Sequence, residues 1–83
     1  MTEPIDQQVL AIVADLIGSD LVRTEPSIRL YDLGLLDSLR TVELLIALSD
    51  EFGIDIAPSE IDRESWATPR DIVELVSGKV TAR

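Results

Sequence analysis

The chain has 83 residues, of which seven are basic and sixteen acidic, giving a formal net charge of -9. This length suits one domain with a single modest core, and we take residues 1–83 as that domain. The negative charge disfavours nucleic acid and anionic membrane surfaces, so we expect partners with basic surfaces. Because cysteine and histidine are both absent, the sequence excludes disulfides and thiolate ligands, and we expect no metal site and no catalytic residues.

The amino-terminal part predicts an amphipathic helix that follows Pro4 and ends at Gly18. Its apolar residues recur at helical spacing: Ile5, Val9, Ile12, Val13, Leu16 and Ile17. The residues before it lack the basic and apolar regions of a signal peptide, and no apolar run approaches the length of a membrane span. We therefore expect a cytoplasmic protein that does not insert into membranes, and a monomer.

Residues 19–37 show no sustained periodicity, although they contain many apolar side chains. These are Leu21, Val22, Ile28, Leu30, Leu33, Leu35 and Leu36. Loops of this length are uncommon unless they have a function or pack as a unit. We expect this long first loop to lie across the helices with its leucines buried.

The strongest helical pattern runs from about Ser38 to Phe52, with Asp37 as a plausible N-cap and Gly53 as the carboxy-terminal signal. With residues placed about 100° apart, one side of this helix forms a core face. That face holds Thr41, Leu44, Leu45, Leu48 and Phe52.

The opposite side of the same helix is also apolar. Leu39, Val42 and Ile46 lie there, beside the acidic residues Glu43 and Asp50. We call these three apolar residues the docking stripe, because buried apolar contact gives affinity while neighbouring carboxylates steer basic partners. In the alternative interpretation, the long first loop covers the stripe.

After Gly53, residues 54–56 are predicted to be briefly extended, and residues 59–63 to form a short third helix. Trp66 is expected to pack this region against the other helices. The overall prediction is an all-α fold, a small bundle of four helices with a long first loop and a short third helix.

The last helix is predicted to begin with Thr68 as N-cap, Pro69 in the first turn and Asp71 completing a variant capping box. Its apolar side holds Ile72, Val73, Leu75 and Val76. Gly78 is expected to end it, and residues 79–83 to be frayed.

Ser38 is the residue with the clearest functional signal. It projects a hydroxyl from a helix start, yet the chain contains no histidine or cysteine to activate it. We therefore expect this hydroxyl to be modified by another protein, and not to act as a catalytic nucleophile.

The stretch from Asp32 to Leu44, DLGLLDSLRTVEL, resembles the signature of acyl and peptidyl carrier proteins, in which an Asp-Ser or His-Ser pair begins the second helix. Ser38 matches the serine that receives a phosphopantetheine arm. The resemblance implies a phosphopantetheinyl transferase that takes the arm from coenzyme A, with Asp37 as N-cap and as a recognition residue for that transferase. It also implies that the arm holds cargo as a thioester, and that the chain is no enzyme.

Two features look most like D-alanyl carrier proteins: two leucines between Gly34 and Asp37, and the stretch Ser59–Pro69. That resemblance implies an adenylating ligase that supplies D-alanine and a downstream acyltransferase or synthase. The acyltransfer machinery that serves teichoic acids in the cell wall would be membrane-bound. Arg40 departs from the acidic residue frequent at this position in fatty-acid carriers, which argues against a role in fatty-acid synthesis and suggests altered partner choice.

Two alternatives stay open. The chain could be an aminoacyl or acyl carrier in natural-product biosynthesis of the nonribosomal peptide or polyketide type, because such carriers share the Gly-Leu-Leu-Asp-Ser segment. It could also be a helical adaptor that is no carrier and binds partners through the docking stripe, with Ser38 as a phosphorylation site or a simple helix start.

Overall fold

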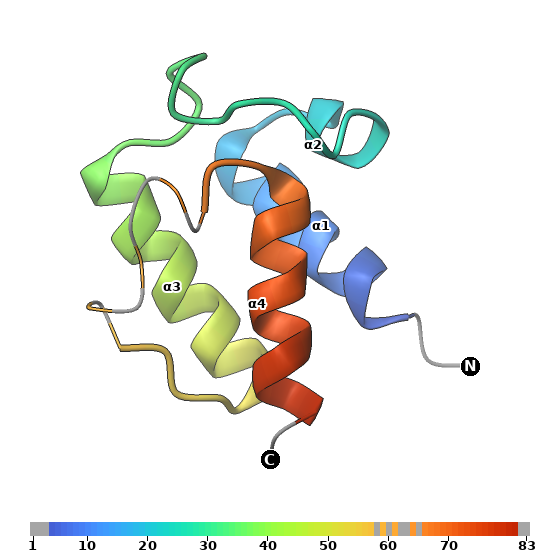
Figure 1. Ribbon diagram of the computed structural model, residues 1–83, viewed down its shortest axis with the longest axis vertical. Helices are drawn as coiled ribbons and strands as arrows, with labels where there is room; N and C mark the ends of the chain where they lie inside the picture. The colour runs from blue at the N-terminus through green and yellow to red at the C-terminus, as the bar shows by residue number, and fades with distance from the viewer. Residues whose placement is uncertain (1–3, 58, 60, 62–63, 65, 82–83) are drawn as a thin grey trace.

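The computed structural model describes residues 4–57, 59, 61, 64 and 66–81. The described residues form four helices and no strand (Figure 1): α1 (Ile5–Ile17), α2 (Leu21–Thr24), α3 (Ser38–Phe52) and α4 (Pro69–Thr81). The predicted all-α architecture is confirmed, and α1, α3 and α4 are the three long helices that the sequence predicts. α1 contacts each of the other three helices and is the central element of the bundle. None of the helices in these residues has the length and apolar character that a membrane span requires.

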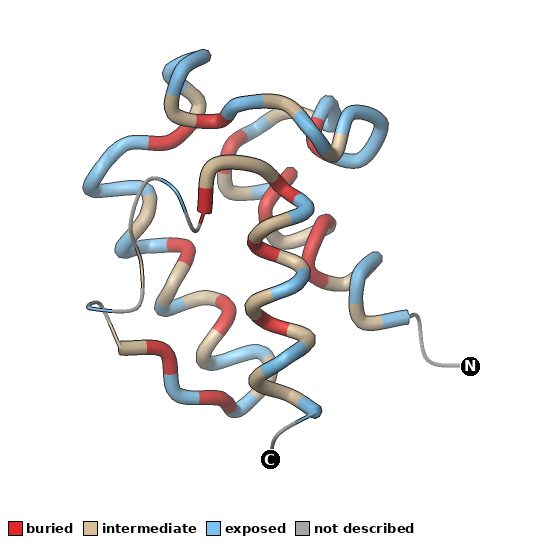
Figure 2. Tube along the Cα trace, in the orientation of Figure 1, coloured by how far each residue is buried: buried red, intermediate tan, exposed pale blue. Residues whose placement is uncertain are grey.

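One hydrophobic core draws on all four helices and on the segments between them, as the buried stretches in Figure 2 show. Its buried members are Val9, Val13, Ala14, Ile17, Val22, Leu30, Leu36, Leu44, Leu48, Ile54, Ile56, Trp66, Ile72 and Val76. Burial of one such large apolar side chain stabilises a fold by roughly 1.5–3 kcal/mol. Because Leu30 and Leu36 belong to this core, the long first loop is fixed to the bundle on its way to α3.

The ends of the first two long helices are as predicted. α1 ends at Gly18 and α3 at Gly53, both in the left-handed conformation, with φ of 79° and 62°. The amide of Gly18 donates to the Ala14 carbonyl, and that of Gly53 to the Ser49 carbonyl, so each cap satisfies a carbonyl of the last turn.

The predicted capping box of α4 is also present. The Thr68 amide donates to Asp71 Oδ2 at 3.3 Å, and the Asp71 amide donates to Thr68 Oγ1 at 3.2 Å. The two residues therefore satisfy each other's backbone donors at the start of the helix.

The predicted end of α4 at Gly78 is wrong, because the helix continues to Thr81. Gly78 does not take the positive φ that ends α1 and α3. Continuing the helix instead allows Val80 to pack against the core, and this burial favours helical residues 79–81 over a frayed end. Residues 82–83 of the predicted frayed segment lie outside the described residues.

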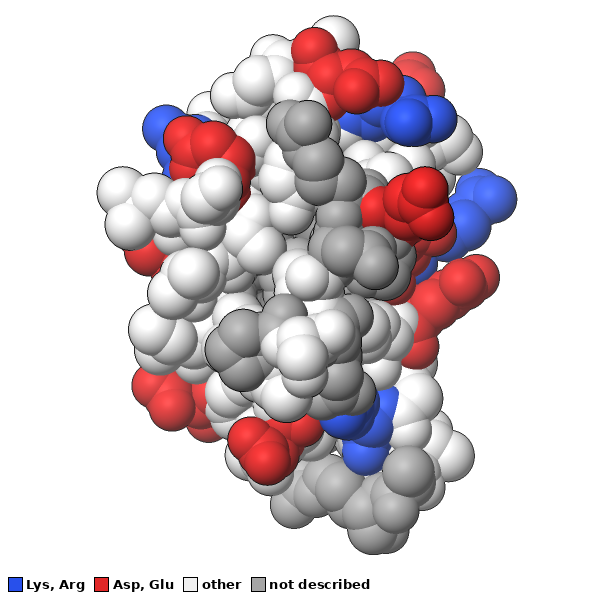
Figure 3. Space-filling model, turned by 60° about the vertical axis from the view of Figure 1, so that its left-hand side comes forward, with Lys and Arg blue, Asp and Glu red and all other residues white. Residues whose placement is uncertain are grey.

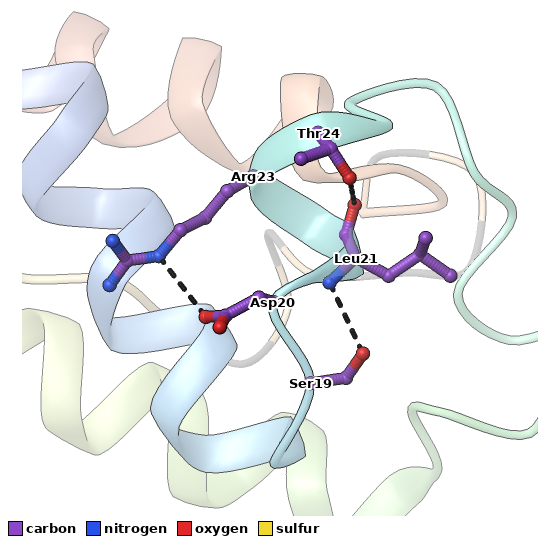
Figure 4. Close-up of polar contacts among 5 residues, drawn as sticks. All are labelled: Ser19, Asp20, Leu21, Arg23 and Thr24. Atoms are coloured by element: carbon purple, nitrogen blue, oxygen red, sulfur yellow. Dashed lines mark hydrogen bonds and ion pairs between the residues drawn. The ribbon is translucent and has the colours of Figure 1, made fainter.

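α2 is a single helical turn that the sequence did not predict (Figure 4). The Leu21 amide donates to Ser19 Oγ at 3.2 Å, and Thr24 Oγ1 donates to the Leu21 carbonyl at 3.3 Å. Asp20 and Arg23 form an exposed ion pair with 3.6 Å between Oδ1 and Nε. So short a helix depends on tertiary packing and on such local bonds more than on helix propensity.

The prediction that the leucines of the long first loop are buried is only partly right. Leu30 and Leu36 are buried, and so is Val22, but Leu33 is 58% exposed and Leu21 is 43% exposed. The loop turns back on itself, so it can direct only some of its apolar side chains towards the core.

The region after α3 is described only in part. Ile54 and Ile56 are buried while Asp55 between them is exposed, which is the alternation expected of an extended segment. The predicted short helix at residues 59–63 lies mostly outside the described residues. Trp66 is fully buried in the core, as predicted.

Candidate functional site

Ser38 is the first residue of α3 and is exposed to solvent. Asp37 before it is extended, with φ of -141° and ψ of -176°, and its Oδ1 accepts a hydrogen bond from the Arg40 amide at 2.8 Å. The predicted N-cap is therefore confirmed. Ser38 is therefore an exposed residue in the first turn of a capped helix.

A tight turn over residues 30–36 precedes the start of α3. The amides of Leu35 and Leu36 both donate to the Leu30 carbonyl, at 2.9 and 3.2 Å, and the Leu30 amide donates to the Ala67 carbonyl at 2.8 Å. Gly34 within the turn has a φ of 73°, where a side chain would be strained. Thus the segment before Ser38 is held by its own backbone bonds and by a bond to the residues that precede α4.

Two hydroxyl groups connect that turn to α3. Tyr31 Oη lies 2.7 Å from Thr41 Oγ1, and Thr41 Oγ1 donates to the Asp37 carbonyl at 2.7 Å. We call these two hydroxyls with the Asp37 carbonyl the hydroxyl bridge. The sequence analysis did not predict this contact of Tyr31. Only the bond from Thr41 to the Asp37 carbonyl has a sequence signal, because a helical threonine often donates to the main-chain carbonyl four residues before it.

The two faces predicted for α3 are both observed. Leu44 and Leu48 on the core face are fully buried, whereas Leu39, Val42 and Ile46 of the docking stripe are 70%, 51% and 53% exposed. The alternative in which the long first loop covers the stripe is therefore wrong.

Charged residues of α3 lie near the stripe. Glu43 and Asp50 are exposed beside it, as predicted, and Arg40 is exposed as well. Figure 3 turns this side of the molecule forward and shows groups of Asp and Glu separated by uncharged surface. Among the described residues there is no group of three or more acidic side chains placed to hold a metal ion.

The site offers a hydroxyl without chemistry of its own. Ser38 is exposed, and the full sequence has no histidine or cysteine that could act beside it as a base or nucleophile. A neighbouring apolar stripe is available for contact with another protein. This arrangement suits a residue that a partner modifies after docking on α3.

Comparison with known proteins gives a consistent result. The family model for the phosphopantetheine attachment site matches residues 7–76. The D-alanyl carrier protein of Lacticaseibacillus casei is 47% identical over 74 residues, which cover 89% of this chain and 91% of that relative. Those of Enterococcus faecalis and Bacillus subtilis are 43% and 42% identical, covering 87% and 86% of this chain and 92% and 91% of the relatives.

Proposed function

Because the chain belongs to the phosphopantetheine-attachment family, we propose that it carries D-alanine as a thioester on an arm attached to Ser38. Family membership makes it a carrier with a covalent prosthetic group, and not an enzyme. The observation that supports Ser38 as the attachment residue is its exposed position at the capped start of α3.

The residues around Ser38 fit this group. An exposed hydroxyl is accessible to a transferase, and a phosphate joined to it would lie near the amino terminus of a long helix, where the helix dipole favours an anion. Asp37 uses one carboxylate oxygen as the cap, and we assign to it a second role in recognition by the transferase. When bound, the phosphopantetheine supplies a terminal thiol that holds the cargo.

The docking stripe is the surface we assign to the carrier's partners. A phosphopantetheinyl transferase must reach the Ser38 hydroxyl, and an adenylating ligase and an acyltransferase must then reach the thiol of the arm attached there. Leu39, Val42 and Ile46 provide apolar contact near it, and Glu43 and Asp50 add negative charge that favours basic partner surfaces. Arg40 is the one basic residue of α3, and we assign it to partner discrimination.

The names of the relatives support the cargo. Those reported above are all named D-alanyl carrier proteins and cover most of this chain. We therefore propose D-alanine as the cargo. From the sequence resemblance we further propose teichoic acid of the cell wall as the acceptor that the acyltransferase serves, and the cytoplasm as the place of loading.

Loading of the armed protein tests the cargo. The protein is first armed with coenzyme A and a phosphopantetheinyl transferase, and then incubated with ATP, D-alanine and a D-alanine-specific ligase, in parallel with ligases for other amino acids and for fatty acids. Intact-mass spectrometry should show faster addition of D-alanine than of any other cargo. Loading of a different amino acid without D-alanine would instead support a natural-product carrier. The Ser38→Ala variant is the control and should accept no cargo.

A further inference from the structure

The hydroxyl bridge connects Tyr31 to the Asp37 carbonyl through Thr41. Thr41 Oγ1 donates to the Asp37 carbonyl at 2.7 Å and also forms a hydrogen bond of 2.7 Å with Tyr31 Oη. The Asp37 carbonyl also accepts from the Thr41 amide at 2.9 Å. This carbonyl therefore receives two hydrogen bonds, both from Thr41, and Tyr31 holds the Thr41 hydroxyl from the other side.

The hydrogen bonds of the bridge lie at the first turn of α3, which has little apolar packing. Residues 37–40 are all exposed, so the first turn of α3 has little apolar contact to order it. The first amides of any helix lack partners within the helix, and helix ends are among the first parts of a fold to open. Order around Ser38 must therefore come from polar contacts: the Asp37 cap and the hydroxyl bridge.

Tyr31 connects the first turn of α3 to Leu30, a residue fixed in the core. It follows Leu30, which is fully buried and bonded through its amide to the Ala67 carbonyl. Thr41 lies one turn into α3 and is partly buried. The bridge thus ties the exposed helix start to the anchored part of the long first loop around Leu30, and this loop runs over the top of the bundle in Figure 1.

We propose that Tyr31 and Thr41 are positioning residues that hold Ser38 in the geometry needed to receive the phosphopantetheine group, an inference that rests on the proposed function. In that reaction Ser38 Oγ forms a bond to the phosphorus that bears the pantetheine in coenzyme A. The pyrophosphate bond breaks, adenosine 3′,5′-bisphosphate leaves with the electron pair, and the hydroxyl proton passes to a base of the transferase. Such an in-line attack is sensitive to small displacements of the attacking oxygen.

Removal of single hydroxyls tests this role. Tyr31→Phe and Thr41→Val should each lower the kcat of arm transfer by about threefold to tenfold, the range that corresponds to one net hydrogen bond, while KM stays within about twofold because the docking stripe is unchanged. The double variant should be no slower than the slower single variant, since Thr41→Val alone already removes both hydrogen bonds of the bridge. Thr41→Ser retains the hydroxyl and should restore the wild-type kcat.

Thr24→Val is a matched control. Its hydroxyl also donates to a main-chain carbonyl, that of Leu21, but in α2 and outside the bridge. This variant should transfer the arm at the wild-type rate. Equal loss of kcat in Thr24→Val and Thr41→Val would show a general effect on stability and would overturn the proposal.

Amide hydrogen exchange gives a second readout that needs no transferase. In Tyr31→Phe, the amides of Arg40 and Thr41 should exchange about threefold to tenfold faster than in the wild type, whereas that of Leu48 in the middle of α3 should change less. Unchanged exchange at the helix start, or wild-type kcat in Tyr31→Phe, would overturn the positioning role. A wild-type chain that accepts no arm would contradict the proposed function, and the exchange data would then still decide whether the bridge orders the helix start.

Discussion

At the scale of single residues, the main property of the site is the solvent exposure of Ser38. Its neighbour Asp37 caps α3 through the Arg40 amide, and the rest of the first turn is open to solvent. A carrier needs such exposure, because a transferase must reach the hydroxyl and the later partners must dock close to the arm attached there. An exposed first turn has little packing to order it, and the Asp37 cap and the hydroxyl bridge compensate for this.

The two roles assigned to Asp37 can be separated by substitution. Asparagine caps a helix about as well as aspartate, whereas alanine does not cap, so Asp37→Ala should lower the free energy of unfolding by about 1 kcal/mol and Asp37→Asn by much less. If the carboxylate also contributes to recognition by the transferase, both variants should raise the KM or lower the kcat of arm transfer. Chemical denaturation and transfer kinetics provide the measurements. Wild-type transfer by Asp37→Asn would leave Asp37 as a cap only.

At the scale of elements, α3 serves two purposes at once. Its buried side, with Leu44 and Leu48, joins it to the core, and its opposite side presents the docking stripe. Both faces were predictable, because helical periodicity alone places residues on one side or the other. So were the ends of α1 and α3, where a capping glycine follows the apolar pattern.

Other elements depended on contacts that a local pattern does not contain. Gly78 has the same residue type as the glycines that end α1 and α3, yet α4 passes through it because Val80 beyond it packs against the core. α2 is one turn long and is set by its packing and side-chain bonds. The contact of Tyr31 with Thr41 requires the folded path of the long first loop, so no spacing rule could reveal it.

The two faces of α3 predict opposite results for one kind of substitution. Ile46→Asp should leave the domain folded, because Ile46 is 53% exposed, but it should weaken transfer from the ligase. Loss of about 60 Å² of apolar contact would correspond to about tenfold in affinity. Leu48→Asp, in contrast, buries an unpaired charge at a fully buried position and should unfold the domain.

Circular dichroism and loading rates distinguish these variants. If Ile46→Asp unfolds as Leu48→Asp does, the stripe contributes to the core and its assignment as a docking surface fails. If Ile46→Asp folds and loads at the wild-type rate, the stripe has no part in binding that ligase.

At the scale of the whole molecule, the chain combines a small core with a strongly acidic surface. The formal charge of -9 is spread over 83 residues, and Figure 3 shows acidic groups beside uncharged surface on the side that carries α3. Such a surface favours rapid encounter with basic partners, and the exposed apolar stripe then gives contact. The family resemblance was visible in the sequence because the motif around Ser38 is contiguous. The contacts that hold this motif, such as that of Tyr31 with Thr41, are tertiary and form only in the folded chain.

Arm transfer to the intact protein tests the central claim most directly. The folded chain is incubated with coenzyme A and a broad-specificity phosphopantetheinyl transferase, and its mass is measured intact and after digestion. We predict the addition of one phosphopantetheine, located on Ser38, and no addition to a Ser38→Ala variant that keeps its helical circular dichroism, since an exposed first-turn hydroxyl contributes little to the core. A folded wild-type chain that gains no mass, or a Ser38→Ala variant that gains as much as the wild type, would contradict the account.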